Sequence, residues 1–288
     1  MATVYLNGAF VPKERAVVPV DDRGFVFGDG IYEVVRVIEG RIFAWAEHAQ
    51  RMARGLGEVR IGFSARDVAA LEAVCERLLA DNDLMAGEAT VYLQVTRGVA
   101  PRLHHFPPAG TAPTVYAAAS RFTPSREMRE RGIAAILLPD IRWARCDVKT
   151  VNLMGAVLAR QSAREAGAYE ALLIRDGMLT EGAATNAFVV MDGVVRTYPL
   201  SNYILPGVTR RHVIDAARDA GVPVVEEPVT QQQLLAAPEV FVAGTTTDVA
   251  PVVAIDGRPV GDGTPGALTR KVQAAFLARL YESAPVAR

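Results

Sequence analysis

Lysine is rare in this chain, and one of the lysines stands where a reactive amine could be held. Of 31 basic residues, only Lys13, Lys149 and Lys271 are lysine, and the others are arginine. A lysine amine can lose its proton and act as a nucleophile or a base, whereas a guanidinium stays protonated. Lys149 follows a predicted buried strand and precedes a predicted helix, where a side chain can be held rigidly at the mouth of a core. From this pattern alone, a solvated lysine is the alternative.

Two segments are suited to binding an anion. PGVT at 206–209 opens a predicted helix, and GTTT at 244–247 is a glycine-hydroxyl turn after a predicted strand. Main-chain N–H groups at such positions, together with the helix dipole, favour phosphate. Ordinary helix and turn caps have the same residues, so each segment is ambiguous by itself.

Glu181 is a lone carboxylate in LTEGAATN, between a predicted strand and small residues that leave room for a flat ligand. An amine, an anion cradle and a carboxylate form the minimal set for pyridoxal phosphate: a covalent partner, a phosphate anchor and a counter-ion for the pyridinium ring. The spacing suggests this cofactor without establishing it, because a glutamate in a surface turn has the same pattern.

The elements that would position these residues begin with short strands joined by tight turns. Asn7-Gly8 and Glu39-Gly40 are typical of hairpin turns. A helix is expected over 47–56, and another opens at Ser64, where S-A-R-D resembles a capping box. Further strands follow, so we expect a small α+β domain over 1–120. RFTPSR at 121–126 is polar and contains proline, as expected of an interdomain linker.

The remainder, 127–288, is predicted to form a larger α/β domain. IAAILLPDIRW is a predicted buried strand, and NLMGAVLARQSAREAG has helical spacing. Strands with Asp-Gly turns follow. Helices are expected in VTRRHVIDAARDAG and from Ala267 to about Leu280.

Composition and charge exclude several classes of function. The 288 residues are 50% hydrophobic and 22% charged, typical of a globular protein, and the formal charge of -1 argues against a nucleic-acid partner. No apolar run approaches a membrane span and no leader pattern is present, so we expect no membrane partner and a cytoplasmic location. Cys75 and Cys146 are too few for a disulfide framework.

Standard catalytic motifs are absent. The chain lacks the phosphate-loop, zinc-protease and hydrolase-elbow patterns, and GDG at 28–30 lacks the third glycine of a dinucleotide fingerprint. His104 and His105 are adjacent, so their side chains would point apart on an extended backbone, and no cysteine or acidic cluster accompanies them. We therefore expect no metal.

Seven segments, in order through nearly the whole chain, resemble the D-amino acid aminotransferases. This family belongs to fold type IV of the pyridoxal-phosphate enzymes, and the resemblance implies its α/β fold. The segments are DRGFVFGDGIYEVVRV, EHAQRM, QVTRGVAPRLHHFP, DIRWARCDVKTVNLMGAVLARQ, LTEGAATNAF, ILPGVTRRHVI and TTTDVAPVVAIDG.

The resemblance implies a role for individual cofactor-site residues. Lys149 matches the catalytic lysine that binds pyridoxal 5'-phosphate covalently, and Glu181 matches the partner of the pyridine nitrogen. Leu205 corresponds to a leucine that packs against the cofactor ring. The implied phosphate contacts are Arg51, Val208, Thr209, Gly244 and Thr245.

The resemblance also implies a trap for the substrate α-carboxylate, formed by Tyr32, Arg102 and His104. Arg102 and His104 would come from the neighbouring subunit of a homodimer, so that the two active sites are shared. A guanidinium can form paired, charge-assisted bonds to a carboxylate, and a phenol and an imidazole add directional donors. Without the resemblance, Arg102-Leu103-His104 would be interpreted as a solvated loop.

Three positions depart from the family pattern. Ala183-Ala184-Thr185 replaces a serine-rich run after the glutamate, and Gly244 replaces a serine in the phosphate turn. We expect the loss of a hydroxyl contact at Ala184 to alter cofactor affinity or release. Arg36 stands where lysine is usual, which keeps the charge and alters its reach.

The function implied is transfer of an amino group from a D-amino acid, with D-alanine as donor and 2-oxoglutarate as acceptor, giving pyruvate and D-glutamate. Alternatives within the same fold are branched-chain L-aminotransferase, (R)-amine transaminase and aminodeoxychorismate lyase. Arg102-Leu103-His104 argues against the first two, which resemble this chain without the trap. From other classes, a cofactor-free binding protein and a dinucleotide oxidoreductase remain as alternatives.

Overall fold

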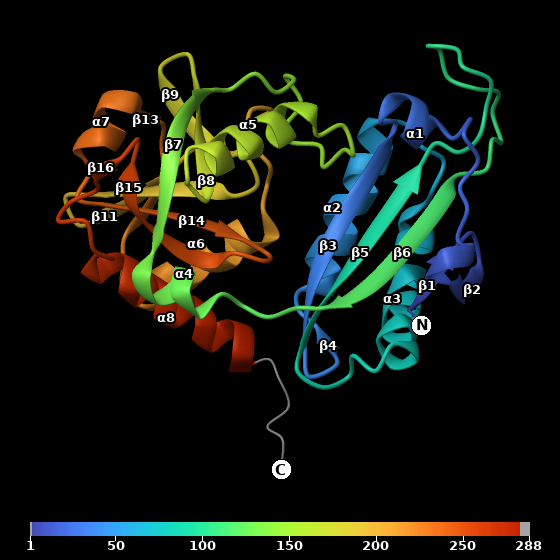
Figure 1. The fold of residues 1–288 in the computed structure, drawn as a ribbon, viewed down its shortest axis with the longest axis horizontal. Helices are drawn as coiled ribbons and strands as arrows, with labels where there is room; N and C mark the ends of the chain where they lie inside the picture. Colours follow the sequence, from blue (N-terminus) through green and yellow to red (C-terminus); the bar gives the residue numbers. More distant parts are fainter. Residues whose placement is uncertain (1, 283–288) are drawn as a thin grey trace. The chain divides into compact units, whose positions relative to one another are not determined.

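The computed structural model describes residues 2–282 (Figure 1). Contacts divide this part of the chain into two compact units. The first contains 2–123 and 148–152, and the second contains 124–147 and 153–282. The segment 148–152, which carries Lys149, therefore packs with the first unit although the chain on either side of it belongs to the second.

The first unit is built on an antiparallel sheet of six strands in the order β2-β1-β6-β5-β3-β4. Its two longest strands, β3 and β5, pair along their whole length, from Gly30↔Thr96 to Ile38↔Glu88. The strands are β1 (Thr3–Leu6), β2 (Ala9–Pro12), β3 (Gly30–Ile38), β4 (Arg41–Ile42), β5 (Glu88–Thr96) and β6 (Thr114–Arg121). The helices are the 3-10 turn η1 (Lys13–Arg15), α1 (Arg23–Phe27), α2 (Trp45–Glu58) and α3 (Ala65–Asp81).

Alternation along β3 sends its side chains to two faces. Ile31, Val35 and Val37 are fully buried in a core with the apolar faces of α2 and α3, which cover one side of the sheet (Figure 1). A fully buried aliphatic side chain contributes about 1.5–3 kcal/mol. Tyr32 lies on the opposite face of the same strand. The first turn of α3 has the predicted capping box, with Ser64 and Asp67 bonding each other's main chain.

The segment 148–152 is bonded to the start of β3. The Tyr32 N–H donates to the Lys149 carbonyl and the Val151 N–H donates to the Gly30 carbonyl, both at 3.0 Å. Val148 belongs to the buried core of the same unit. These contacts fix the main chain of Lys149 against a central strand.

Helix α1 is a single short turn just before β3. Asp22 caps its N-terminus by accepting from the Gly24 N–H at 2.8 Å. It ends at Gly28, whose φ of 67° is left-handed and whose added Cβ would lie 3.2 Å from the Cβ of Asn152. Glycine is therefore favoured twice, by conformation and by the close approach of the segment that carries Lys149.

The second unit contains a mixed sheet in the order β12-β11-β10-β14-β15-β7-β8-β9-β13, with β16 paired to β15. β7 is parallel to both β15 and β8, and β11 is parallel to β12. The strands are β7 (Ile133–Pro139), β8 (Glu170–Arg175), β9 (Met178–Gly182), β10 (Asn186–Met191), β11 (Val194–Thr197), β12 (Val224–Glu226), β13 (Val229–Thr230), β14 (Glu239–Gly244), β15 (Asp248–Ile255) and β16 (Arg258–Pro259).

The helices of the second unit are α4 (Arg126–Arg131), α5 (Met154–Glu165), α6 (Val208–Asp219), α7 (Gln231–Ala236) and α8 (Ala267–Glu282). Helix α5 contacts β7 and β8, while α6 and α8 contact each other and β14. Cross-strand partners Phe188 and Phe241 are fully buried and stack with their ring centroids 4.7 Å apart. These layers fix the strand ends that carry the candidate site.

The longer predicted elements are confirmed. The helices expected over 47–56, from Ser64, in the segment before Gly167, in VTRRHVIDAARDAG and from Ala267 are present as α2, α3, α5, α6 and α8. Three short helices, α1, α4 and α7, were not predicted, because five or six residues are too few to show helical periodicity.

Candidate active site

The Lys149 amine lies beside a tyrosine ring on the sheet face of the first unit. Its Nζ donates to the Tyr32 Oη at 3.2 Å and is 4.3 Å from the centre of the same ring. Together with the main-chain bond between these residues, this contact gives the half-buried amine a defined direction. Lys13 and Lys271 are exposed, on η1 and α8.

Aromatic rings continue from Tyr32 across the sheet. The Tyr32 and Tyr92 rings stack 5.7 Å apart, and Tyr116 lies 6.3 Å from Tyr92. Burial raises the pKa of Tyr92 to about 12, so its hydroxyl is protonated and donates to Gln94 at 2.7 Å. This face offers apolar ring surface with protonated phenols beside the amine.

Arg36 points from the same strand and is only 2% exposed. Its Nε donates to the Glu88 carboxylate at 2.8 Å, and its guanidinium lies 3.9 Å from the centre of the Phe122 ring. The arginine that departs from the family pattern therefore has an acidic partner and a stacking partner within its own unit.

Arg51 is held on the buried face of α2 by an acid that sequence reasoning missed. Its Nε and Nη2 each donate to the Glu33 carboxylate at 2.7 Å, and His48 Nδ1 is 2.8 Å from the same carboxylate. Burial opposes ionisation of Glu33, but the charge of Arg51 and the bonds from Arg51 and His48 outweigh it and lower the Glu33 pKa to about 2. The guanidinium is thus fixed by a permanent anion, with its five N–H donors directed by that pairing.

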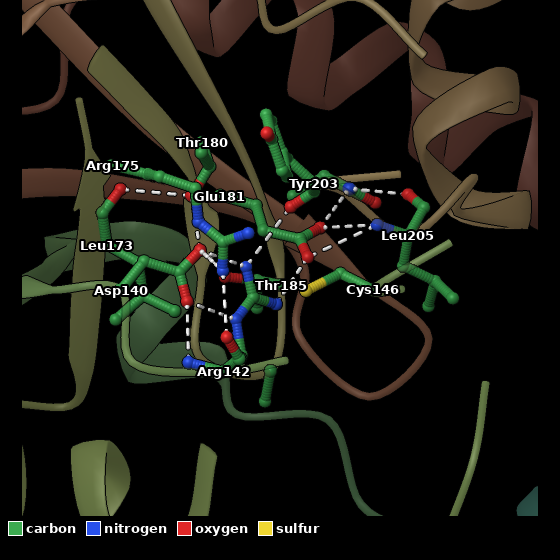
Figure 2. Close-up of polar contacts among 12 residues, drawn as sticks. Asp140, Arg142, Cys146, Leu173, Arg175, Thr180, Glu181, Thr185, Tyr203 and Leu205 are labelled. Atoms are coloured by element: carbon green, nitrogen blue, oxygen red, sulfur yellow. Dashed lines mark hydrogen bonds and ion pairs between the residues drawn. The ribbon is translucent and has the colours of Figure 1, made fainter. Parts of the chain in front are cut away.

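Glu181 is the centre of a buried polar cluster in the second unit (Figure 2). Its carboxylate accepts from Arg142 Nη1 at 2.5 Å, from Asn186 Nδ2 at 2.8 Å and from the Leu205 main-chain N–H at 3.0 Å. It lies on β9 and is 3% exposed. The same Asn186 nitrogen also donates to the Leu205 carbonyl at 2.9 Å, which fixes Leu205 beside the carboxylate.

Arg142 is itself oriented by a second carboxylate. Asp140, at the end of β7, accepts from Arg142 Nε and Nη2, both at 2.9 Å, and its oxygens also contact Arg175 at 3.1 Å and the Thr180 hydroxyl at 3.2 Å (Figure 2). The cluster therefore balances two carboxylates with two guanidiniums. Arg142 was not assigned a role from the sequence.

Burial raises the pKa of Glu181 to about 7, and the Arg142 charge acts in the opposite direction by favouring the carboxylate. Burial also raises the pKa of the nearby Cys146 thiol, which keeps it protonated. A carboxylate in this setting gains from any added cation, because a positive charge would restore what burial removed.

The predicted phosphate segments lie at strand and helix ends of the second unit. Gly207 caps α6 without a side chain, so the N–H groups of the first turn, including those of Val208 and Thr209, have no intrahelical acceptor. An added Cβ at Gly207 would collide with the Asn186 side chain, so glycine is required here.

Gly244 ends β14, and the Thr247 N–H donates to its carbonyl at 3.1 Å to close the turn that contains Thr245. The departure at 183–185 also has a local explanation. The Thr185 hydroxyl donates to Glu170, at 2.9 Å, and that glutamate is fully buried. Thr185 therefore serves the fold.

Arg102 and His104 lie in the exposed segment between β5 and β6 of the first unit. Both flank Phe27 of α1: the Arg102 guanidinium is 5.3 Å and the His104 ring 5.7 Å from the Phe27 ring centre. The structure thus brings together Lys149 with Tyr32, Glu181 with Leu205, and Arg102 with His104. The roles assigned to these residues remain predictions.

The described residues, 2–282, include no group of histidine, cysteine, aspartate or glutamate side chains suited to a metal ion. Within the same range, no helix is both long and apolar enough to cross a membrane.

The family model for amino-transferase class IV matches residues 30–255. A D-alanine aminotransferase of Staphylococcus epidermidis is 41% identical over 276 residues, which cover 96% of this chain and 97% of the relative. Among solved structures, the Escherichia coli branched-chain amino acid aminotransferase superposes with a TM-score of 0.88 at 29% identity, covering 96% of this chain and 93% of that one. A second branched-chain amino acid aminotransferase, from T.th. and complexed with N-(5'-phosphopyridoxyl)-L-glutamate, gives 0.86 at 29% identity, covering 99% and 95%.

Proposed function

The chain belongs to the class IV aminotransferases, and from this membership we propose that it is a pyridoxal-5'-phosphate-dependent D-amino acid aminotransferase. It transfers the amino group of D-alanine to 2-oxoglutarate and forms pyruvate and D-glutamate. The observation that carries the choice of substrate is the 41% identity, over 96% of the chain, to a D-alanine aminotransferase.

The side chains present fit this cofactor. Lys149 supplies an amine, Glu181 a buried carboxylate suited to a cationic ring nitrogen, and the first turn of α6 supplies N–H groups for a phosphate. When bound, the cofactor supplies an aromatic ring that accepts the electron pair left at the substrate α-carbon.

Lys149 performs two tasks in this proposal. Its Nζ binds the cofactor covalently, and after the substrate amine replaces it, the freed amine takes the proton from the substrate α-carbon. The Tyr32 hydroxyl, 3.2 Å away, keeps Nζ directed along the sheet face. The same amine returns the proton at the end of the transfer.

Glu181 holds a proton on the ring nitrogen by offering it a negative partner. Arg142 makes this possible, because its charge favours the carboxylate against the effect of burial on the Glu181 pKa. Asp140 in turn holds Arg142 in place through two bonds. The cofactor phosphate would be held by Arg51, by the N–H groups of Val208 and Thr209, and by the turn of Gly244 and Thr245.

We place Tyr32, Arg102 and His104 at the substrate α-carboxylate, with the last two supplied by the second subunit of a cytoplasmic homodimer. Support for a covering partner comes from apolar side chains of the first unit that face solvent: Phe25 is 77% exposed and Leu103 51%. Large exposed apolar patches are rare on monomers and often mark interfaces.

A branched-chain L-aminotransferase is the second candidate, because structures of that activity superpose closely on this chain. The proposal is tested by measuring keto-acid release from paired D- and L-amino acids and from (R)-1-phenylethylamine. We expect D-alanine to be the preferred donor with 2-oxoglutarate. Preference for L-leucine or L-isoleucine would select the second candidate.

A further inference from the structure

The segment that carries Arg102 and His104 has no regular secondary structure, yet it is tied to a buried charge cluster of its own unit. Arg23 of α1 donates from Nη1 to the Leu103 carbonyl at 2.7 Å, between the two proposed carboxylate-binding residues. The Arg23 side chain is only 4% exposed, although Leu103 is 51% exposed. A buried arginine therefore reaches out to hold an exposed loop by its main chain.

Arg23 is fixed from behind by Asp29. Its Nε donates to Asp29 Oδ2 at 2.9 Å, and the same carboxylate accepts from Arg97 Nε at 2.7 Å and Nη2 at 2.9 Å. Arg97 also donates to the carbonyls of Val59 and Arg60, at 2.7 and 2.8 Å. One carboxylate thus orients two buried guanidiniums, so neither arginine is free to change its direction.

Phe27, on the same helix, provides the surface against which the loop side chains lie. The Arg23 guanidinium is 4.7 Å from the ring centre, and Arg102 and His104 lie at 5.3 and 5.7 Å. The start of the loop is fixed as well, because the Arg23 N–H donates to the Gly98 carbonyl at 2.9 Å. Helix α1 therefore contacts the loop at its beginning, through Leu103, and through both functional side chains.

We infer that Arg23 and Phe27 are positioning residues for substrate recognition: with Asp29, they hold the Arg102–His104 segment in the conformation that binds the α-carboxylate. This inference rests on the proposed function for the identity of the ligand. It assigns to α1 a role in substrate selection without contact with the substrate. Holding the loop before binding lowers the conformational entropy lost when the carboxylate is bound.

The test compares Arg23→Gln, Phe27→Leu and the control Arg121→Gln as holoenzymes. Arg121 is a fair control because it is exposed, belongs to the same unit, and also donates to main-chain carbonyls, those of Ala86 and Asp83 at 2.8 and 2.7 Å. Hydrogen exchange is followed in peptides covering 99–106, and kcat and KM are measured for D-alanine. Phe27→Leu keeps the Arg23 bonds, so it serves if Arg23→Gln does not fold.

For Arg23→Gln we expect roughly tenfold faster exchange in the loop and a KM for D-alanine raised about tenfold, with kcat changed much less, because uniform binding is lost. Phe27→Leu should shift both quantities in the same direction, and the control should shift neither. Unchanged loop exchange in both α1 variants would overturn the inference, whatever happens to KM. If the wild-type enzyme does not use D-alanine, the proposed function fails, and the exchange data alone decide whether α1 orders the loop.

Discussion

The Lys149 amine and the Tyr32 phenol lie 3.2 Å apart, and the main chains of the same two residues are joined by a 3.0 Å hydrogen bond. Because both contacts start from one central strand, the position of the amine is set by the sheet and not by a flexible side chain alone.

This pairing leads us to expect that Lys149 is the only cofactor-bearing lysine. Borohydride reduction of the holoenzyme followed by peptide mapping should find the pyridoxyl group on Lys149, and Lys149→Ala should bind cofactor only reversibly. Lys271→Arg is the control, since Lys271 is exposed on α8, and it should retain full labelling. A pyridoxyl group on Lys13 or Lys271 would reject the assignment.

Glu181→Gln should affect chemistry more than folding. The amide keeps a similar shape within the cluster but carries no charge, so the ring nitrogen would favour its neutral form and accept electrons less well. We expect the variant to fold and bind cofactor, with kcat lower by roughly a hundredfold. Wild-type turnover in this variant would exclude the role given to Glu181.

Arg142→Leu should shift the pH profile of the reaction. Without the guanidinium, the Glu181 pKa rises further above about 7, so the carboxyl takes up its proton at higher pH. The acidic limb of kcat/KM should therefore move to higher pH. The control is Arg175→Leu, because Arg175 shares Asp140 with Arg142 but has no bond to Glu181. Equal shifts in both variants would show that loss of charge near Asp140, and not the Arg142–Glu181 pair, sets the limb.

Glu33 should contribute to stability in a defined pH range. Its pKa falls from 4.5 to about 2 on folding, so the contribution is fully present above pH 4.5 and is lost as pH falls toward 2. The shift corresponds to about 3 kcal/mol at neutral pH. Urea unfolding of Glu33→Gln should show a loss of this order at pH 7 and a flatter acid limb than wild type. A variant as stable as wild type at pH 7 would contradict the assignment.

Shared active sites can be tested by complementation between inactive subunits. Lys149→Ala and Arg102→Ala are unfolded and refolded together. If Arg102 serves the partner's site, mixed dimers contain one intact site, so roughly one quarter of all sites recover at random pairing. If Arg102 serves its own subunit, every site keeps a defect. Activity that does not exceed the average of the parents, despite confirmed subunit exchange, would exclude sharing.

Local sequence patterns predicted the elements that carry the site. The helix that begins at Val208 and the capping box at Ser64 depend on residues within a few positions of one another, so they are visible in the sequence. The candidate residues Lys149 and Glu181 were found because a rare amine and a lone carboxylate stand at strand ends.

The partners of these residues could not be predicted in the same way. Arg142 meets Glu181 across 39 residues of sequence, and Arg23 meets Leu103 across 80. Which of many arginines reaches a given carboxylate or carbonyl is decided by tertiary packing, for which a single sequence has no local signal. Arginine's abundance in this chain hid the few that act at the site.

The pairing of 148–152 with β3 has a consequence for synthesis of the protein. Val148 belongs to the core of the first unit, and the strand edge at Gly30 and Tyr32 is completed by Val151 and Lys149. When the ribosome has made only the first 123 residues, that core lacks a side chain and that edge lacks two bonds. The N-terminal unit therefore finishes folding only after much later residues emerge, and an unpaired strand edge is exposed until then. A nascent chain stalled at residue 123 is predicted to be more protease-sensitive at β3 than one stalled well beyond 152.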